Sequence, residues 1–478
     1  MKNTMKNILI LIPSILLLIA CEDLLKEEPK AIASETFYNT SNEVAAAANA
    51  MYSPFKTGDF ENYWALVECN VDYGKGRGSW ASNSNFAGLD ATNITRVSLI
   101  WGQIYLSIRN ANLVIMNTPN GLQTTDIQKT QYIAEAKFIR AFNYFLLVRN
   151  WAGVPLRTEE TFTQIEIPRS SVSAVYDLIL SDLQFAEQNL PDNARLIGTP
   201  SKWTAKTLLA DVHLNLKNWT QARDLANEVI QSGKYSLVKV SVPDDYYKIF
   251  DAHVATSSEE IFFIKHNAIE GSFFGMFAHH PNAPYINKRG YYGHYTLDNN
   301  SVIANWDAND LRRQAWFYPF NIGVAPNTML YKKYIHLDAT GNPGTDIPVY
   351  RYPDILYIYA EAANFASNGP TAEAVEYLNQ VRRRAYGFDP KVTSPVDFKV
   401  GDYNKDTFFD LIIKERGYET LYEGKRWHEL VRTGKAKQII KEVHGKDIAD
   451  KHFLLPIPIT ETNYNKAIDP ATDQNPGY

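Results

Sequence analysis

Cysteine is scarce in this chain of 478 residues, which contains two, Cys21 and Cys69. Two thiols can form at most one intramolecular disulfide, so a fold stapled by several disulfides is excluded. The stability must therefore come from a large hydrophobic core, and 45% of the residues are hydrophobic. A chain of this length can bury such a core as one large unit or as two or three domains of roughly 100 to 200 residues each.

Positive charge is not in excess either. The chain has 48 Lys and Arg residues against 53 Asp and Glu residues, which gives a formal net charge of −5. A protein that binds nucleic acid needs a basic surface to neutralise the phosphates. We therefore exclude nucleic acid as a partner.

Catalytic and cofactor motifs are missing as well. The segment GKGRGS at 74–79 lacks the spacing of a phosphate-binding loop, and GSWAS at 78–82 lacks the second glycine of a nucleophile elbow. The ten histidines form no H-E-x-x-H pair. We therefore expect no enzyme and no bound cofactor. The carboxylates Asp72 and Asp90, which lie near Trp80 in the sequence, leave sugar hydrolysis open as an alternative.

No apolar run is long enough to span a bilayer. The run at 8–19 has roughly a dozen residues and includes Pro13 and Ser14, whereas a membrane-spanning helix needs ~20. Lysines precede this run and LIAC at 18–21 follows it, which is typical of a bacterial lipoprotein signal. We predict acylation of Cys21 as the only membrane attachment. An ordinary secretory signal is the alternative.

Cleavage before Cys21 has two consequences for the mature chain. It removes Lys2 and Lys6, which brings the formal net charge to −7. It also leaves Cys69 without a disulfide partner, because the thiol of Cys21 would carry lipid.

Helical periodicity dominates the rest of the chain. Apolar residues at three- and four-residue spacing predict helices over 42–55, 97–118, 126–151, 172–189, 201–216, 219–232, 352–367 and 371–386. The last four form two pairs that each span about 34 residues, the period of tetratricopeptide repeats. Small side chains stand where helices of such repeats pack closely: Ala205, Ala210, Ala360 and Ala363. Unrelated helical hairpins of matching length are the alternative.

We predict a mainly α protein in three parts. Residues 1–20 are the signal, 21–41 an acidic tether with an extended arm, and 42–478 a single body. In that body, tetratricopeptide-like helices occupy about 42–236 and 351–435, and an irregular, aromatic-rich region occupies about 237–350. A second irregular stretch is expected at 59–93. Function often resides in such loops, because a rigid scaffold can present them.

Aromatic residues are concentrated in the irregular region, with eleven rings among residues 285–334. A sugar has apolar ring faces and polar hydroxyls, so its binding site needs flat aromatic rings edged by Asn, Asp, Gln or Arg. We therefore predict a glycan site with these residues: Asp72, Trp80, Asn83, Arg289, Tyr291, Tyr292 and Trp306. The alternative is that the rings form a satellite core under long loops, and for Trp306 this alternative is favoured.

Three glutamates near the C-terminus raise the question of a metal site. Glu415, Glu419 and Glu423 follow each other at four-residue spacing with His428 nearby, as in carboxylate metal sites of helix bundles. Basic residues surround them: Arg416, Lys425, Arg426 and Arg432. We therefore interpret the glutamates as part of an ion-paired helix face and predict no metal centre.

Five segments carry a family resemblance. They are AEAKFIRAFNYFLLVRNWAGVPL at 134–156, RYPDILYIYAEAANFASNG at 351–369, LNQVRRRAYG at 378–387, IIKERGYETLYEGKRWHELVRTGK at 412–435 and LLPIPITETNYNKAIDPATDQNPGY at 454–478. With them the chain resembles the SusD/RagB family of Bacteroidetes outer-membrane lipoproteins, which serve nutrient uptake at polysaccharide and peptide utilisation loci. The resemblance covers nearly the whole chain and is weakest at 59–93 and 237–350.

The resemblance implies a binding function without chemistry. It implies an α body with tetratricopeptide-like helix pairs and a loop-borne site, seated on the mouth of a SusC-like TonB-dependent transporter that receives the captured oligosaccharide. The acidic residues after Cys21 resemble the family's surface-export context, which implies the outward leaflet of the outer membrane. A family member that binds peptide or another nutrient is the first alternative. A surface glycan hydrolase is the second.

Overall fold

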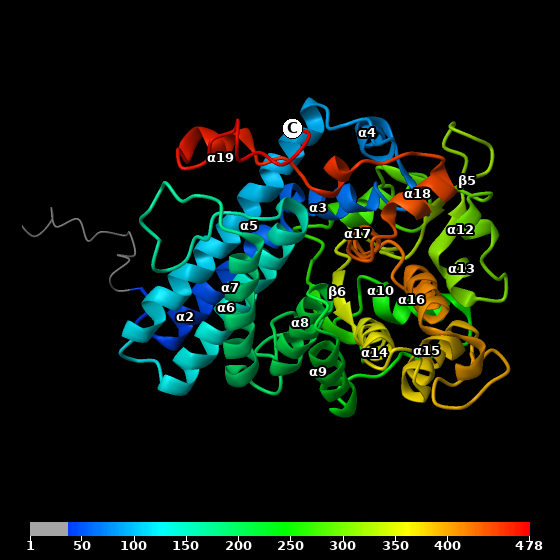
Figure 1. Cartoon of the computed structure of the whole chain (residues 1–478), viewed down its shortest axis with the longest axis horizontal. Helices are drawn as coiled ribbons and strands as arrows, with labels where there is room; N and C mark the ends of the chain where they lie inside the picture. The colour runs from blue at the N-terminus through cyan, green and yellow to red at the C-terminus, as the bar shows by residue number, and fades with distance from the viewer. Residues whose placement is uncertain (1–36) are drawn as a thin grey trace, which may run out of the picture.

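The computed structural model describes residues 37–478, so the predicted signal and Cys21 lie outside the described residues. The described chain is mainly α-helical, as the sequence predicts. Three long helices lie side by side on one flank of the molecule (Figure 1): α5 (Ala91–Asn117), α6 (Asp126–Trp151) and α7 (Val172–Asn189). Among residues 37–478, no helix combines the length and the apolar character needed to cross a membrane.

The helices continue from this flank as a stack in which each packs on the next. α7 packs on α8 (Lys202–Asn215), and α8 packs on α9 (Trp219–Gln231). α9 then packs on α14 (Tyr352–Ala366), which packs on α15 (Ala372–Ala385) (Figure 1). The residues 232–351 are thus an insertion between two neighbouring helix pairs, and the two helix pairs predicted from the sequence are confirmed.

Local sequence accounts for where these helices begin and end. The Thr125 hydroxyl accepts a hydrogen bond from the Gln128 amide, and the Gln128 side chain accepts one from the Thr125 amide, so the two residues cap α6. Lys217 and Gly233 take φ angles of 60° and 65° just after α8 and α9, a left-handed conformation that ends a helix. The four alanines predicted at close helix contacts are at most 1% exposed: Ala205, Ala210, Ala360 and Ala363.

Helix α3 was not predicted. Helix α3 (Gly58–Glu68) occupies the start of the stretch at 59–93 that was expected to be irregular. The side chains that recur at helical spacing are all buried: Phe60, Tyr63, Trp64 and Val67. The hydroxyl of Thr57 accepts a hydrogen bond from the Phe60 amide and caps the helix. The glycine and polar residues at its start hid this periodicity.

The strands lie in and around the insertion. A four-stranded antiparallel sheet has the order β1 (Lys75–Gly76), β3 (His294–Leu297), β5 (Thr328–Tyr331) and β4 (Phe317–Pro319). A second, two-stranded sheet pairs β2 (Glu260–Ile264) with β6 (Ile347–Arg351). Strand β6 runs directly into α14, so it returns the chain to the helical stack.

The remaining helices are short or C-terminal. They are α2 (Ser41–Ala50), α4 (Ala81–Ser84), α10 (Tyr247–Phe250), α11 (Phe273–Ala278), α12 (Ser301–Ala304), α13 (Leu311–Trp316), α16 (Lys405–Glu419), α17 (Arg426–Arg432), α18 (Ala436–His444) and α19 (Ile459–Tyr464). Most buried apolar side chains form one cluster that extends from α2 past α18. A second, small cluster of Ala283, Tyr318 and Leu330 lies under the loops of the insertion.

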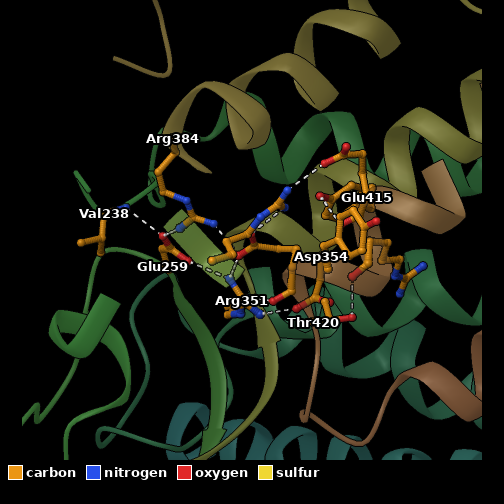
Figure 2. A network of polar contacts seen from close by, with 12 residues as sticks. Val238, Glu259, Arg351, Asp354, Arg384, Glu415 and Thr420 are labelled. Carbon is orange, nitrogen blue, oxygen red and sulfur yellow. Dashed lines mark hydrogen bonds and ion pairs between the residues drawn. The ribbon is translucent and has the colours of Figure 1, made fainter. Parts of the chain in front are cut away.

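A buried network of ion pairs joins the insertion to the helical stack (Figure 2). Arg351 lies 3.1 Å from Glu259, 2.5 Å from Glu419 and 2.7 Å from Glu423, and all four side chains are fully buried. Arg384 of α15 pairs with both Glu259 and Glu419. The network connects β6, α15 and the end of α16, so it holds the insertion in place.

This network answers the question of the three glutamates. The sequence predicts Glu415, Glu419 and Glu423 on one helical face. Helix α16 ends at Glu419, so Glu423 lies beyond the helix and this part of the prediction is wrong. Burial by itself would raise the pKa of Glu419, but the guanidinium groups of Arg384 and Arg351 hold that pKa well below its usual range. The interpretation of these carboxylates as ion-paired is confirmed by the contacts.

Candidate ligand-binding site

The two irregular stretches of the sequence meet at the pairing of β1 with β3. Lys75 pairs with Tyr295 and Gly76 with His294, and the Arg77 amide donates to the Gly293 carbonyl at 2.7 Å. A Cβ on Gly293 would lie 1.9 Å from the Phe277 ring, so this close approach requires glycine. The pairing places residues 77–96 beside residues 277–296, although about 200 positions separate them in the sequence.

The loop at 287–292 is pinned against the end of α11. The Tyr291 amide donates to the Met276 carbonyl at 2.9 Å, and the Tyr292 amide donates to the His279 carbonyl at 2.8 Å. Tyr292 has a φ of 37°, which is costly for an aromatic residue and persists only where the surroundings impose it. The backbone under both tyrosines is therefore held in one conformation.

Aromatic and guanidinium groups gather on the outer side of this junction. The Cζ atom of Arg77 lies 3.9 Å from the centroid of the Tyr292 ring, whose centroid is 4.5 Å from that of His280. Tyr291 is 54% exposed and contacts Phe273, with 5.6 Å between ring centroids. Arg289 is exposed in the same loop. The exposed Tyr291 ring can contact a sugar face, and the arginines of the same junction can contact its polar substituents.

Trp80 does not form the open platform that the sequence suggested. Its ring is 6% exposed, because Phe277 packs at its edge and Arg96 covers a face. The Cζ atom of Arg96 lies 3.6 Å from the indole centroid. Arg96 also donates to the Ser79 hydroxyl and to the Asn93 side chain, each at 2.8 Å. At this position a ligand would meet the guanidinium group, with Trp80 as its support.

Three further predicted residues are buried. The Asn83 side chain is 5% exposed and donates to Asn93 at 3.3 Å. Asp72 is 1% exposed and accepts a hydrogen bond of 2.6 Å from Arg426. Trp306 is 2% exposed and stacks on Tyr418, with 4.0 Å between ring centroids. Trp306 is therefore part of the core, which is the alternative favoured from the sequence.

The structure thus brings only part of the predicted set together. Trp80, Tyr291, Tyr292 and Arg289 lie around the junction of β1 and β3. Asp72 instead lines a separate cavity of about 410 Å³ together with Tyr418, the stacking partner of Trp306. The carboxylate pair considered for sugar hydrolysis is engaged elsewhere, since Asp72 pairs with Arg426 and Asp90 caps α5.

Sequence reasoning missed the two arginines that define the site, Arg77 and Arg96. Arg77 belongs to the GKGRGS segment, which was interpreted as a flexible loop, and Arg96 lies within the first two turns of α5. A local signal existed: the segment 75–96 has Lys75, Arg77 and Arg96 against the single acid Asp90, in a chain that is acidic overall.

A group of possible metal ligands lies in another part of the insertion. His253, His336 and Asp338 have ligand atoms within 4.8 Å of one another, the one such group found among residues 37–478. The Nδ1 atom of His336 accepts the Gly344 amide at 3.1 Å, which leaves the ring proton on Nε2, the atom nearer Asp338. Nε2 of His253 lies 3.0 Å from Asp338. These contacts make a surface ion-pair cluster.

Comparisons with known proteins agree with this architecture. Residues 285–478 match the model of the SusD family, and residues 23–214 match a family described as starch-binding and associating with the outer membrane. The SusD-like protein P2 of Formosa agariphila is 29% identical over 518 residues, covering 97% of this chain and 98% of that protein.

Solved structures have the same fold. A SusD homologue from Bacteroides thetaiotaomicron superposes with a TM-score of 0.80 at 22% identity, over 95% of this chain and 100% of the homologue. A laminarin-binding SusD-like protein superposes with a TM-score of 0.75 at 24% identity, over 92% of this chain and 100% of that structure. A helical stack with a long loop-bearing insertion is thus the common architecture. The chain belongs to the SusD/RagB family.

Proposed function

We propose that the protein captures an oligosaccharide at the junction of β1 and β3 and passes it to a TonB-dependent transporter of the outer membrane. The observation that carries the proposal is the exposed Tyr291 ring next to Tyr292, over which the Arg77 guanidinium lies, on a loop whose backbone is pinned to α11. A ring that is already held in place loses little conformational freedom when a sugar packs on it, so binding costs less.

The comparisons support a glycan as the ligand. One matched family is described as starch-binding, and a solved relative of the same fold is described as laminarin-binding. In this proposal the protein performs no chemistry on the sugar. The carboxylates Asp72 and Asp90, which hydrolysis would need, are engaged in an ion pair and a helix cap. The protein raises the concentration of ligand above the transporter.

The proposal also places the protein at the membrane. Lipid on Cys21 would hold it at the outward leaflet of the outer membrane, where the transporter lies. A transporter has to supply the energy for import, since the chain has no nucleotide-binding motif. The TonB-dependent partner is an inference from the family.

A binder of peptides or of another nutrient is the second candidate. An exposed guanidinium group such as that of Arg289 would suit the carboxylates of a peptide as well as those of a sugar.

One screen separates the candidates. The mature chain from residue 21, made soluble by Cys21→Ala, is applied to a glycan array and to a peptide library, and hits are followed by calorimetry and product analysis. We expect saturable glycan binding with the ligand recovered intact. Cleaved sugar would identify a hydrolase, and binding confined to peptides would overturn the glycan proposal.

A further inference from the structure

The site at the junction of β1 and β3 is basic, although the protein is acidic. Its two segments, 75–96 and 277–296, together contain five Lys and Arg residues and one carboxylate, whereas the whole chain has a net charge of −5. The basic residues are Lys75, Arg77, Arg96, Lys288 and Arg289, and the acid is Asp90. A charge contrast of this kind favours an anionic ligand at this place over the rest of the surface.

The arginines here differ from those of the core in what they contact. In the core, each of Arg351, Arg384 and Arg426 forms short ion pairs with carboxylates. Within residues 37–478, Arg77, Arg96 and Arg289 form no ion pair with any carboxylate. Stacking satisfies only the faces of the guanidinium groups of Arg77 and Arg96, so hydrogen-bond donors remain at their edges.

Stacking also prepares these groups for binding. The Arg77 guanidinium lies over the Tyr292 ring and the Arg96 guanidinium lies over the Trp80 ring. The Arg96 group is further oriented by its bonds to Ser79 and Asn93. A planar guanidinium that is already oriented can bind a carboxylate or a sulfate through two parallel hydrogen bonds at little entropic cost.

The neighbouring histidine reports the same local charge. Partial burial and the positive charge of Arg77 both lower the pKa of His280, which contacts Tyr292 and Phe320. Lys75 shares its pocket with the acidic Glu442. The basic character of the site therefore rests on its arginines.

We infer that the captured oligosaccharide is acidic, with carboxylate or sulfate groups that Arg77, Arg96 and Arg289 bind while Tyr291 packs on a sugar ring. This inference rests on the proposed function and names its substrate class. Uronic acids and sulfate esters carry such groups, and both present two acceptor oxygens on one atom to a guanidinium.

The test measures binding of four defined probes by calorimetry. They are a polygalacturonate tetrasaccharide, the same tetrasaccharide with its carboxyl groups reduced to alcohols, a sulfated carrageenan tetrasaccharide and a laminarin tetrasaccharide. We expect at least one acidic probe to bind tenfold or more tighter than the two neutral probes. That affinity should fall as the salt concentration rises from 50 to 500 mM, because exposed charges are screened. The uronate and sulfate arms distinguish the two sources.

Matched variants connect the preference to the site. Arg77→Gln and Arg289→Gln are each expected to lower the affinity for the acidic probe by tenfold or more. The affinity for any neutral probe that binds should not change. The control is Arg223→Gln, which removes an arginine from α9 that pairs with Asp224. Thermal melting of each variant checks that it is folded. Arg77→Lys is a second variant, which keeps the positive charge but cannot donate the two parallel hydrogen bonds of a guanidinium.

The outcomes separate this inference from the proposed function. If the laminarin or the reduced probe binds as tightly as the acidic ones and without salt dependence, the acidic class is wrong and glycan capture stands. If no glycan of the four or of the array binds, glycan capture itself fails. If acidic probes bind but the Arg77 and Arg289 variants match the parent, the site has been placed wrongly.

Discussion

The guanidinium group of Arg96 lies over the indole ring of Trp80, with 3.6 Å between Cζ and the ring centroid. This contact joins the start of α5 to the loop after β1. Trp80 is therefore a buried support and not the open sugar platform that the sequence predicts. The face of the ring that the sequence offers as a sugar platform is covered by this arginine.

Trp80→Ala is therefore expected to destabilise the fold. The substitution removes a buried ring that also contacts Phe277, so it should cost about 3 to 5 kcal/mol of unfolding free energy. Urea denaturation of the variant and the parent measures the loss. A variant as stable as the parent would mean that Trp80 is exposed in solution, as an open platform requires.

Tyr291→Ala should have the opposite profile. This ring is 54% exposed, so its loss should leave stability nearly unchanged. Glycan binding should weaken by about 1 to 3 kcal/mol, or roughly five- to 150-fold, because one stacking face is removed. Calorimetry with the ligand from the array measures it. The matched control is Tyr464→Ala in α19, a tyrosine that is 79% exposed, and this variant should bind like the parent. Equal binding by both variants would exclude Tyr291 from the site.

Glu68 predicts a pH-dependent stability. It lies at the end of α3, accepts hydrogen bonds from the Tyr73 hydroxyl and the Gly424 amide, and is fully buried. Burial raises the pKa of this carboxyl from 4.5 to about 7. Between these two values the folded chain retains a proton that the unfolded chain has released, so the contribution of Glu68 to stability falls as the pH rises through this window.

Glu68→Gln cannot titrate and isolates this contribution. The free energy of unfolding of the variant minus that of the parent should increase from pH 4.5 to pH 7.5, by up to about 3 kcal/mol. The buried histidines titrate in both proteins and cancel in this difference. Urea denaturation at pH 5, 6, 7 and 8 provides the measurement. A difference that stays constant over this range would show that the folded Glu68 carboxyl titrates normally.

The lipid anchor gives the last prediction. Cys21→Ala removes the only predicted acylation site, so a membrane-bound protein should become soluble while its melting temperature stays the same. Fractionation of cells that lack the transporter decides it, because the transporter could otherwise retain the protein. If the variant still sediments with the outer membrane in those cells, Cys21 is not the anchor. Trp80→Phe, which leaves Cys21 intact, serves as a membrane-bound control.

The helical stack could be predicted from the sequence because its signals are local. Residues 126–151 and 172–189 form helices at the predicted bounds, since apolar spacing and capping residues lie within a few positions of each helix. Helix α3 had the same signal, but a glycine and polar residues at its start concealed it. The family resemblance depends on the same regular segments.

The site was decided by tertiary structure. Whether Trp80 is exposed depends on Phe277, which is almost 200 positions away and is brought close by the pairing of β1 with β3. Asp72 forms an ion pair with Arg426, and Glu423 does not lie on the helical face because α16 ends before it. Sequence by itself determined the long helices of the stack, because local spacing sets secondary structure. Only the folded chain decided which loop side chains reach solvent, because burial is the sum of contacts between segments far apart in the sequence.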